Sequence, residues 1–216
     1  MPTIRSGIII GLLLVLSIGP AGSQADAIAI TGSAGLIDET GQPVTLNSYK
    51  QYLRLVFFGY TQCPDICPLT MYFVANALKM LGPDAEKVRV LFITIDPKRD
   101  TPEILANYTE AFHPAIIGLT GSYDTLMAIT EEFRTTFGYT ITADGKERTV
   151  GRREYATLAV DASYVPYHSS QIYLLDRAGR IADVIGYGSD SNDIVARLRL
   201  TLAATNGAQE AGDVKQ

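Results

Sequence analysis

The sequence is poor in cysteine, in histidine and in net positive charge, and each shortage narrows the class of protein. Two cysteines among 216 residues, Cys63 and Cys67, are too few for a disulfide framework. A pair so close in the chain also closes too small a loop to stabilise the fold much. The formal net charge of -5 provides no basic field for a polyphosphate, so nucleic-acid binding is not expected. We therefore expect the two cysteines to carry chemistry.

The composition is that of an ordinary globular protein. Hydrophobic residues make up 47% of the chain and charged residues 19%, which argues against a disordered, collagen-like or coiled-coil protein. The length fits one domain with an extension, and no internal repeat is visible. We predict a domain over residues 28–203 and a disordered tail over residues 204–216.

The N-terminal residues 1–27 predict export. Arg5 is followed by an apolar run over residues 8–18 and then by small residues ending at Ala27, the pattern of a secretory signal peptide. Residues 6–25 carry no charge, so an uncleaved anchor of about 20 residues also fits. No cysteine lies nearby to carry a lipid. We predict a periplasmic or otherwise extracytoplasmic protein, either secreted or anchored to the inner membrane by this segment alone.

Strand and helix signals alternate along the rest of the chain. Apolar, often β-branched runs predict strands over residues 53–58, 88–95, 115–119, 171–175 and 181–185. Helical spacing and capping residues predict helices starting at Pro68, at Asp100 or Thr101, at Ser122 and at Ser191, the last ending near Leu202. Between them, residues 139–160 predict an inserted hairpin around Asp144-Gly145 and no helix. The order predicts an α/β fold: a thioredoxin-like mixed sheet flanked by helices, with the hairpin before a loop that carries His168.

The segment Cys63-Pro64-Asp65-Ile66-Cys67-Pro68 is the main chemical motif. If Pro68 begins a helix, Cys67 lies at its cap and Cys63 on the loop one turn earlier. Unpaired N–H groups and the positive end of the helix dipole favour thiolate at both positions. Thiolate is the form that binds metals and attacks disulfides, so the motif is compatible with either role.

The two histidines differ in their surroundings. His113 follows a predicted helix and is expected to make a surface contact. His168 ends the inserted hairpin, where a loop can fold over a neighbouring strand end; a buried histidine bonded to a carbonyl is the plain structural interpretation. Two thiolates and one imidazole would suit Cu(I), or Cu(II) with an added water or carbonyl. Zinc with a solvent ligand fits the same residues, and spacing does not decide between the metals.

Four segments together resemble the Sco/SenC family of copper chaperones for cytochrome c oxidase assembly. They are residues 57–68 (FFGYTQCPDICP), 94–102 (TIDPKRDTP), 117–121 (IGLTG) and 168–169 (HS). The resemblance runs from about Gly35 to Leu202. It implies a thioredoxin-like fold and one copper ion, Cu(I) or Cu(II), held by Cys63, Cys67 and His168. It also implies delivery of copper to, or reduction of cysteines of, the binuclear copper centre of oxidase subunit II.

One position departs from the family pattern. Tyr167 stands where the family usually has Asp, immediately before the histidine. An acidic neighbour would orient or charge-stabilise the imidazole, so its absence is expected to weaken metal affinity and retention.

Two alternatives to the copper chaperone remain open. A thiol–disulfide oxidoreductase of the extracytoplasmic space, without obligatory metal, would use Cys63 and Cys67 as attacking and resolving thiols and would need a thiol reductant as partner. The three intervening residues favour metal over this role, since thioredoxin-type motifs have two. A peroxidase is suggested by Thr61, two residues before Cys63, although the proline usual before that threonine is absent.

Other polar residues have structural explanations. We expect Asp96 and Pro97 to end a strand, and Asp100 and Asp65 to cap helices. The charges between Lys146 and Glu154 are expected to form the solvated face of the hairpin, and none of them is a predicted ligand.

Overall fold

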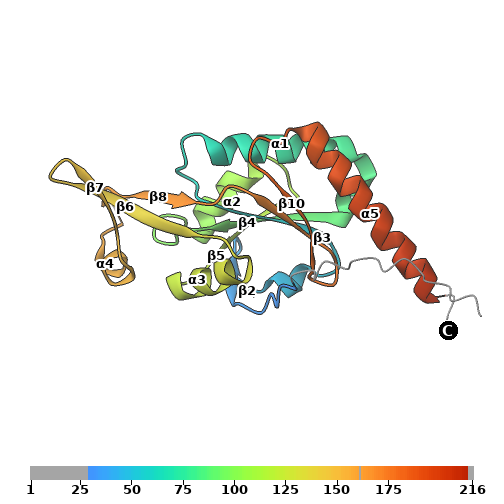
Figure 1. The fold of residues 1–216 in the computed structure, drawn as a ribbon, viewed down its shortest axis with the longest axis horizontal. Coiled ribbons are helices and arrows are strands. Elements are labelled where there is room, and N and C mark those ends of the chain that lie inside the picture. Colours follow the sequence, from blue (N-terminus) through green and yellow to red (C-terminus); the bar gives the residue numbers. More distant parts are fainter. Residues whose placement is uncertain (1–28, 161, 214–216) are drawn as a thin grey trace, which may run out of the picture.

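The computed structural model describes residues 29–160 and 162–213, so the predicted signal or anchor segment, residues 1–27, lies outside the described residues. A seven-stranded mixed sheet with the order β10-β9-β3-β4-β5-β1-β2 forms its centre (Figure 1). Its strands are β1 (Leu36–Asp38), β2 (Pro43–Val44), β3 (Leu53–Gly59), β4 (Val88–Thr94), β5 (Ile116–Thr120), β9 (Ile172–Leu175) and β10 (Ile181–Ile185). Strands β3, β4 and β5 are parallel, and the outer strands pair antiparallel.

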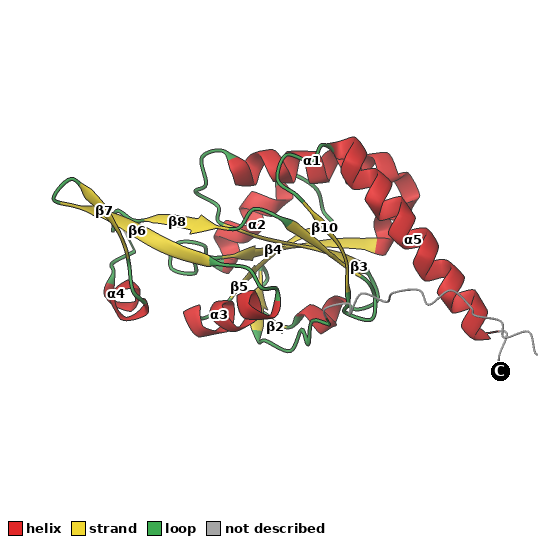
Figure 2. Ribbon diagram, in the orientation of Figure 1, coloured by secondary structure: helices red, strands yellow, loops and turns green. Residues whose placement is uncertain are grey.

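Helices cover both faces of this sheet. They are α1 (Ile66–Leu81), α2 (Pro102–Glu110), α3 (Tyr123–Glu132) and α5 (Ser191–Asp213), while α4 (Arg152–Thr157) lies away from this sheet. Figures 1 and 2 show α1 and α5 along one side of the sheet and α3 along the other. Every residue of β3 is buried, as expected for a central strand covered on both faces. The predicted fold, a thioredoxin-like mixed sheet flanked by helices, is confirmed.

A second, three-stranded sheet projects from the domain and carries the predicted hairpin (Figure 1). Its order is β7-β6-β8, with β6 (Phe137–Ala143), β7 (Lys146–Thr149) and β8 (Val165–His168). Asp144 and Gly145 connect β6 to β7 with φ values of 52° and 71°, the left-handed conformation that such a two-residue turn requires. The hairpin and its turn are confirmed.

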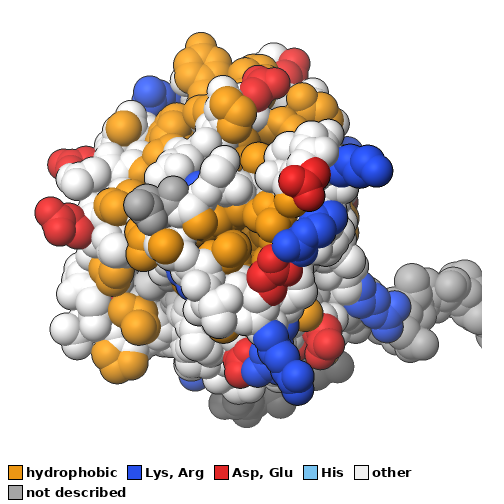
Figure 3. All heavy atoms as spheres, turned by 90° about the vertical axis from the view of Figure 1, so that its left-hand side faces the viewer, with side chains coloured by type: hydrophobic (Ala, Val, Ile, Leu, Met, Phe, Trp, Pro, Cys, Tyr) orange, Lys and Arg blue, Asp and Glu red, His pale blue; other side chains and the backbone are white. Residues whose placement is uncertain are grey.

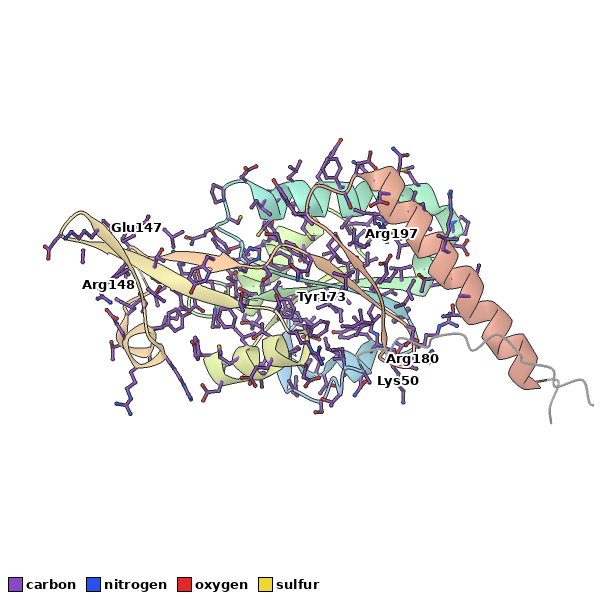
Figure 4. All side chains as sticks on the ribbon, viewed as in Figure 1. Lys50, Glu147, Arg148, Tyr173, Arg180 and Arg197 are labelled. Atoms are coloured by element: carbon purple, nitrogen blue, oxygen red, sulfur yellow. The ribbon has the colours of Figure 1, made fainter. Side chains whose placement is uncertain are left out.

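The charged face of the hairpin is confirmed for β7, whose four residues are all exposed. Figure 4 shows Glu147 and Arg148 on this projecting sheet, away from the core. Strand β8, on the other side of β6, instead exposes Val165 and Tyr167. Viewed from the hairpin side, hydrophobic side chains are spread across the molecule and most Lys and Arg side chains lie along one side (Figure 3). The exposed part of this sheet is therefore partly apolar.

The prediction that residues 139–160 contain no helix is wrong at α4. This helix is too short for an apolar period to show in the sequence. Its Tyr155 is buried and stacks on Tyr139 of β6, with ring centroids 3.9 Å apart and planes 5° apart. The packing of Tyr155 against β6 therefore stabilises a short helix that the local sequence does not predict.

The last helix, predicted to end near Leu202, continues in α5 to Asp213 and so runs through most of residues 204–216, the segment expected to be a tail. Extending an existing helix costs far less than starting one, and this stretch contains alanine, glutamine and glutamate, which favour helix. No helix in the part of the chain that the structure describes has both the length and the apolar character needed to cross a bilayer.

Helix α2 packs so closely on β5 that the contact requires glycine at position 118. A Cβ atom added at Gly118 would lie 2.6 Å from Cβ of Leu105. We expect Gly118→Ala to lower the free energy of unfolding by about 1–3 kcal/mol, the usual cost of overpacking. Gly35→Ala is the matched control: no atom lies within 4 Å of its added Cβ, so it should change stability by less than about 0.5 kcal/mol. Urea unfolding of both variants measures this, and equal midpoints would contradict the packing argument.

Candidate metal centre

The two cysteines lie where β3 passes into α1. The helix begins at Ile66 with Asp65 at its N-cap, so the prediction that it starts at Pro68 is wrong by two residues. Cys67 is therefore inside the first turn and is completely buried, whereas Cys63 lies on the preceding loop and is partly exposed. Both are free thiols. The Asp65 side chain makes no capping hydrogen bond.

Gly59, the last residue of β3, makes room for the buried sulfur. A Cβ atom there would lie 3.0 Å from Cys67 Sγ and 2.9 Å from ring atoms of Phe57 and Phe92. Real Cβ contacts are longer, so any larger residue would displace the sulfur or the rings. The glycine thus allows the thiol to pack directly on the end of the central strand.

Hydrogen bonds divide the charge unequally between the two thiols. The hydrogen bond with the Cys67 thiol has the largest effect on the pKa of Cys63, which it lowers. Hydrogen bonds from the backbone N–H groups of Asp65 and Cys67 lower it further. Partial burial opposes these effects, and the resulting pKa of Cys63 is about 5. The Cys67 N–H lies 3.4 Å from Cys63 Sγ. The hydrogen bond to Cys63 and burial both raise the pKa of Cys67. The reduced pair therefore holds its proton on the buried sulfur and its negative charge on the accessible one.

His168 reaches this pair from the second sheet. It is the last residue of β8, paired with Phe137 of β6, so its predicted place on a loop is wrong; strand pairing fixes it instead. Its Nε2 lies 3.6 Å from Cys67 Sγ, and its Nδ1 lies 2.9 Å from the carbonyl oxygen of Ser169. Because a carbonyl only accepts, Nδ1 must carry the proton, and the lone pair of Nε2 faces the sulfur.

Tyr167 plays no part in orienting the imidazole. Successive strand residues point to opposite faces, and Tyr167 packs over Gly138 of β6, where an added Cβ would lie 2.4 Å from the tyrosine hydroxyl oxygen. The Ser169 carbonyl supplies the hydrogen bond that an acidic neighbour was expected to give. Edge-on contacts with the rings of Phe57 and Tyr60 further fix the imidazole plane.

The donor set fits a soft cation. Two ligands of one ion, at about 2.3 Å for sulfur and about 2.0 Å for nitrogen, lie roughly 3.5 Å apart, close to the 3.6 Å between Cys67 Sγ and His168 Nε2. Within the residues that the structure describes, no three His, Cys, Asp or Glu side chains already form a closed metal site. The Cys67 backbone N–H points at Cys63 Sγ, and the Cys67 sulfur lies against His168 Nε2.

Tyrosines attach the histidine-bearing sheet to the end of β4. Tyr164 donates a hydrogen bond of 2.6 Å to the buried carboxylate of Asp96, and Tyr139 donates to the carbonyl of Ile95. Arg99 pairs with the same aspartate. These contacts set the position of β8 relative to the cysteines. Asp96 has a structural role, as predicted. Its hydrogen bond to Tyr164 was not predicted, because the two residues lie far apart in the sequence.

Asp100 does not cap α2 as expected, because Thr101 holds that position and accepts a hydrogen bond from the Ile104 N–H at 3.3 Å. Asp100 is fully buried and accepts hydrogen bonds from the backbone N–H and hydroxyl of Thr61. Since the Thr61 hydroxyl is used in this way, it is not free to donate to a peroxide at Cys63. The structure thus weakens the peroxidase alternative.

His113 lies far from the cysteines along the sheet. It lies three residues before the start of β5 and accepts a hydrogen bond from the Ala115 N–H at 3.1 Å. The cysteines follow the opposite, C-terminal end of the parallel strand β3. His113 is therefore a turn residue, and the structure does not bring it to the candidate site.

Comparison with known proteins gives the same family as the motifs. The family model described as SCO1/SenC matches residues 22–203. The chain belongs to the SCO1/SenC family. A SCO2-like protein of Rickettsia prowazekii is 36% identical over 155 residues, covering 72% of this chain and 68% of the relative. Protein sco1 of Schizosaccharomyces pombe is 36% identical over 164 residues, covering 76% of this chain and 57% of the relative.

Solved structures of this family include copper complexes. ScoI of Bradyrhizobium japonicum with copper bound has a TM-score of 0.64 at 31% identity, covering 77% of this chain and 96% of that chain. Yeast Sco1 with copper bound has a TM-score of 0.65 at 28% identity, covering 78% of this chain and 86% of that chain. The SCO1/SenC fold described above therefore extends over most of both molecules.

The unequal thiols predict selective alkylation of the reduced, metal-free protein. Iodoacetamide should modify Cys63 alone, with a rate that rises as pH increases through about 5, because the thiolate reacts and burial protects Cys67. In urea both cysteines should react, and the rate of alkylation should rise with pH through a midpoint of about 8.5, the pKa of an unperturbed cysteine. Mass spectrometry of peptides identifies the modified residue. Faster labelling of Cys67, or a midpoint for folded Cys63 near that of the unfolded chain, would contradict the described charge distribution.

Proposed function

We propose that this SCO1/SenC protein is a copper-binding metallochaperone. It binds one copper ion, Cu(I) or Cu(II), through Cys63, Cys67 and His168, and delivers it to the binuclear copper centre of cytochrome c oxidase subunit II. The observation that carries the proposal is the 3.6 Å approach of His168 Nε2 to Cys67 Sγ, beside the Cys63 thiolate. Copper-bound ScoI and Sco1 structures support the choice of metal.

The chemistry of the donors favours copper over zinc. Two thiolates and one imidazole satisfy the low coordination number of Cu(I), whereas Zn²⁺ would need solvent as a fourth ligand. Cys63 is the more exposed of the two cysteine ligands. An incoming thiolate of the acceptor protein therefore approaches the metal from the side on which Cys63 lies. Copper then passes through an intermediate that shares ligands of both proteins, and His168, the one neutral donor, is the ligand released most easily.

Reduction of the acceptor's cysteines is a second candidate function. The accessible Cys63 thiolate attacks a disulfide sulfur of the partner, and Cys67 resolves the mixed disulfide. A separate thiol reductant must then return the pair to the dithiol state. The observation in favour is the division of roles between an exposed thiol of low pKa and a buried thiol of raised pKa.

The protein is proposed to act outside the cytoplasm, in the periplasm or an equivalent compartment. The predicted export segment supports this location. A relative named SCO2 of Saccharomyces cerevisiae, described as mitochondrial, is 32% identical over 179 residues. Outside the cytoplasm a close dithiol persists only if a metal or a reductant protects it, which both candidate functions provide.

The metal proposal predicts one Cu(I) per chain, bound through two sulfurs and one nitrogen. Cys63→Ala and Cys67→Ala should each abolish high-affinity binding, because a single thiolate leaves an incomplete site for the soft ion. Competition titration under reducing conditions measures affinity, and X-ray absorption identifies the ligands. Oxygen-only or histidine-only ligation, or a preference for zinc in a mixed-metal titration, would falsify the proposal.

His168→Ala should weaken Cu(II) binding more than Cu(I) binding, since the borderline imidazole matters more to the harder ion. We expect the Cu(II) affinity to fall at least about tenfold, the loss caused by removing even a group that only supports a ligand, and the Cu(I) affinity to fall less. His113→Ala is the matched control and should bind both ions as the unmodified protein does. Equal losses of Cu(I) and Cu(II) in His168→Ala would contradict the ranking.

The same variant separates the two candidate functions. The proposed copper transfer to the isolated domain of oxidase subunit II should fail in His168→Ala. Reduction of a disulfide in that domain needs only the two cysteines and should survive. Retained reduction with normal maturation of the oxidase would favour the thiol reductase over the chaperone.

A further inference from the structure

A single buried carboxylate, that of Asp96, connects the end of β4 to the second sheet. Asp96 is completely buried. Its Oδ1 accepts a hydrogen bond of 2.6 Å from the Tyr164 hydroxyl, and the Tyr155 hydroxyl lies 3.5 Å from the same oxygen. Its Oδ2 pairs with the Arg99 guanidinium. Tyr155 belongs to α4 and Tyr164 directly precedes β8, so the carboxylate contacts the segment between β7 and β8 at two places.

Arg99 restrains Tyr164 from a second direction. Its guanidinium carbon lies 3.9 Å from the centroid of the Tyr164 ring, within the range of a cation–π contact. One of its nitrogens donates to the Tyr164 carbonyl at 3.5 Å. The Arg99 side chain is only 14% exposed, so solvent screens its ion pair with Asp96 less than it screens a surface pair. Asp96 and Arg99 together therefore hold the hydroxyl, the ring and the backbone of Tyr164.

The restraint on Tyr164 reaches His168 through one short strand. Strand β8 follows Tyr164 immediately and has four residues, of which His168 is the last. In Figure 1, β8 runs from the projecting sheet back toward the central sheet. All four residues pair with β6, and Tyr139 of β6 donates to the carbonyl of Ile95, next to Asp96. Because this pairing makes β8 move as a unit, a displacement of Tyr164 also moves the imidazole.

A second ion pair attaches the same segment to the domain but differs in burial. Arg152 of α4 pairs with Asp124 of α3, and their side chains are 67% and 63% exposed. An exposed pair of this kind contributes little, because solvent and salt screen it. We therefore expect the buried contacts of Asp96, and not the Arg152 pair, to hold the second sheet in place.

We propose that Asp96 is a positioning residue for His168. It holds the second sheet so that the imidazole stays beside the cysteines, and it thereby determines whether the site offers three donors or two. The positional half of this inference concerns the metal-free chain alone. The metal half rests on the proposed function, because it assumes that Cys63, Cys67 and His168 bind copper.

The position of the imidazole matters more to one oxidation state of copper than to the other. When His168 moves away, two thiolates remain, and they suit the soft Cu(I) ion. Cu(II) is harder and depends more on the nitrogen donor. Loss of the Asp96 carboxylate should therefore weaken Cu(II) binding more than Cu(I) binding, although this side chain bonds to Tyr164 and Arg99 and not to a metal ligand.

Two variants remove the contacts of Asp96 to different extents. Asp96→Ala removes both the hydrogen bond to Tyr164 and the ion pair with Arg99. Tyr164→Phe removes only the hydroxyl, so it keeps the Asp96–Arg99 pair and the ring that the guanidinium covers. Asp124→Ala breaks the exposed pair with Arg152 and is the matched control.

The test of position is acylation of histidine by diethyl pyrocarbonate in the reduced, metal-free protein at one fixed pH, with the modified peptides identified by mass spectrometry. The reagent attacks the unprotonated ring nitrogen, which in His168 is Nε2, held 3.6 Å from the buried Cys67 sulfur. His113, remote from the second sheet, is the internal reference. In Asp96→Ala and Tyr164→Phe the rate at His168 relative to His113 should rise on the order of tenfold, the factor expected from losing a hydrogen bond to a charged group.

The control should leave this relative rate unchanged. An equal rise in Asp124→Ala would show that any change at this interface releases the histidine, and no rise in Asp96→Ala would show that other contacts hold it. Either result would overturn the proposal. If circular dichroism shows that Asp96→Ala does not fold, Tyr164→Phe is held to the same criterion.

The copper readout is the affinity for Cu(II) and for Cu(I), measured by competition titration. Asp96→Ala should lower the Cu(II) affinity on the order of tenfold and the Cu(I) affinity less. The double variant Asp96→Ala/His168→Ala should bind Cu(II) as His168→Ala does, since a positioning residue acts only through the ligand that it positions. A further loss in the double variant, or equal losses of both ions in Asp96→Ala, would count against the inference. If the unmodified protein binds no copper, the proposed function fails, while the acylation of His168 still decides the role of Asp96.

Discussion

The approach of His168 Nε2 to Cys67 Sγ joins two segments 101 residues apart, and the candidate site depends on it. Several otherwise unrelated features serve this one contact. Gly59 leaves space for the sulfur at the end of β3, the Ser169 carbonyl fixes the imidazole tautomer, and tyrosines fasten the second sheet to the end of β4. Without the projecting sheet, the thioredoxin-like domain would present a dithiol but no nitrogen ligand.

The site combines one accessible thiolate with groups that are almost entirely enclosed. Cys63 faces solvent with a lowered pKa, whereas Cys67 and Asp100 are buried. Metal exchange and disulfide exchange both begin at an exposed thiolate, so the geometry by itself serves either reaction. What favours the metal is the third donor, since disulfide exchange has no need of an imidazole directed at the resolving sulfur. By placing the imidazole of His168 beside the cysteine pair, the fold favours metal binding over disulfide exchange.

Local patterns predicted much of the fold and the identity of the reactive thiols. Strands β3 and β4 are continuous apolar runs, and the caps at Thr101 and Ser122 mark the helices that follow them. The sequence did not indicate that His168 ends a strand, because the pairing partner Phe137 belongs to a distant segment. The bonds from Thr61 and Thr94 to Asp100 were hidden for the same reason, since they form only when β3, β4 and the following loop meet.

The orientation of His168 is supplied by the main chain. A backbone carbonyl is present whatever side chain residue 169 carries, and the side chain of residue 167 points away from the imidazole. The tautomer is therefore insensitive to substitution at both neighbouring positions, provided that the turn after β8 keeps its shape. An acidic residue before the histidine is one way to hold a metal-binding ring; this chain reaches the same geometry through its backbone and leaves the preceding position open to aromatic packing.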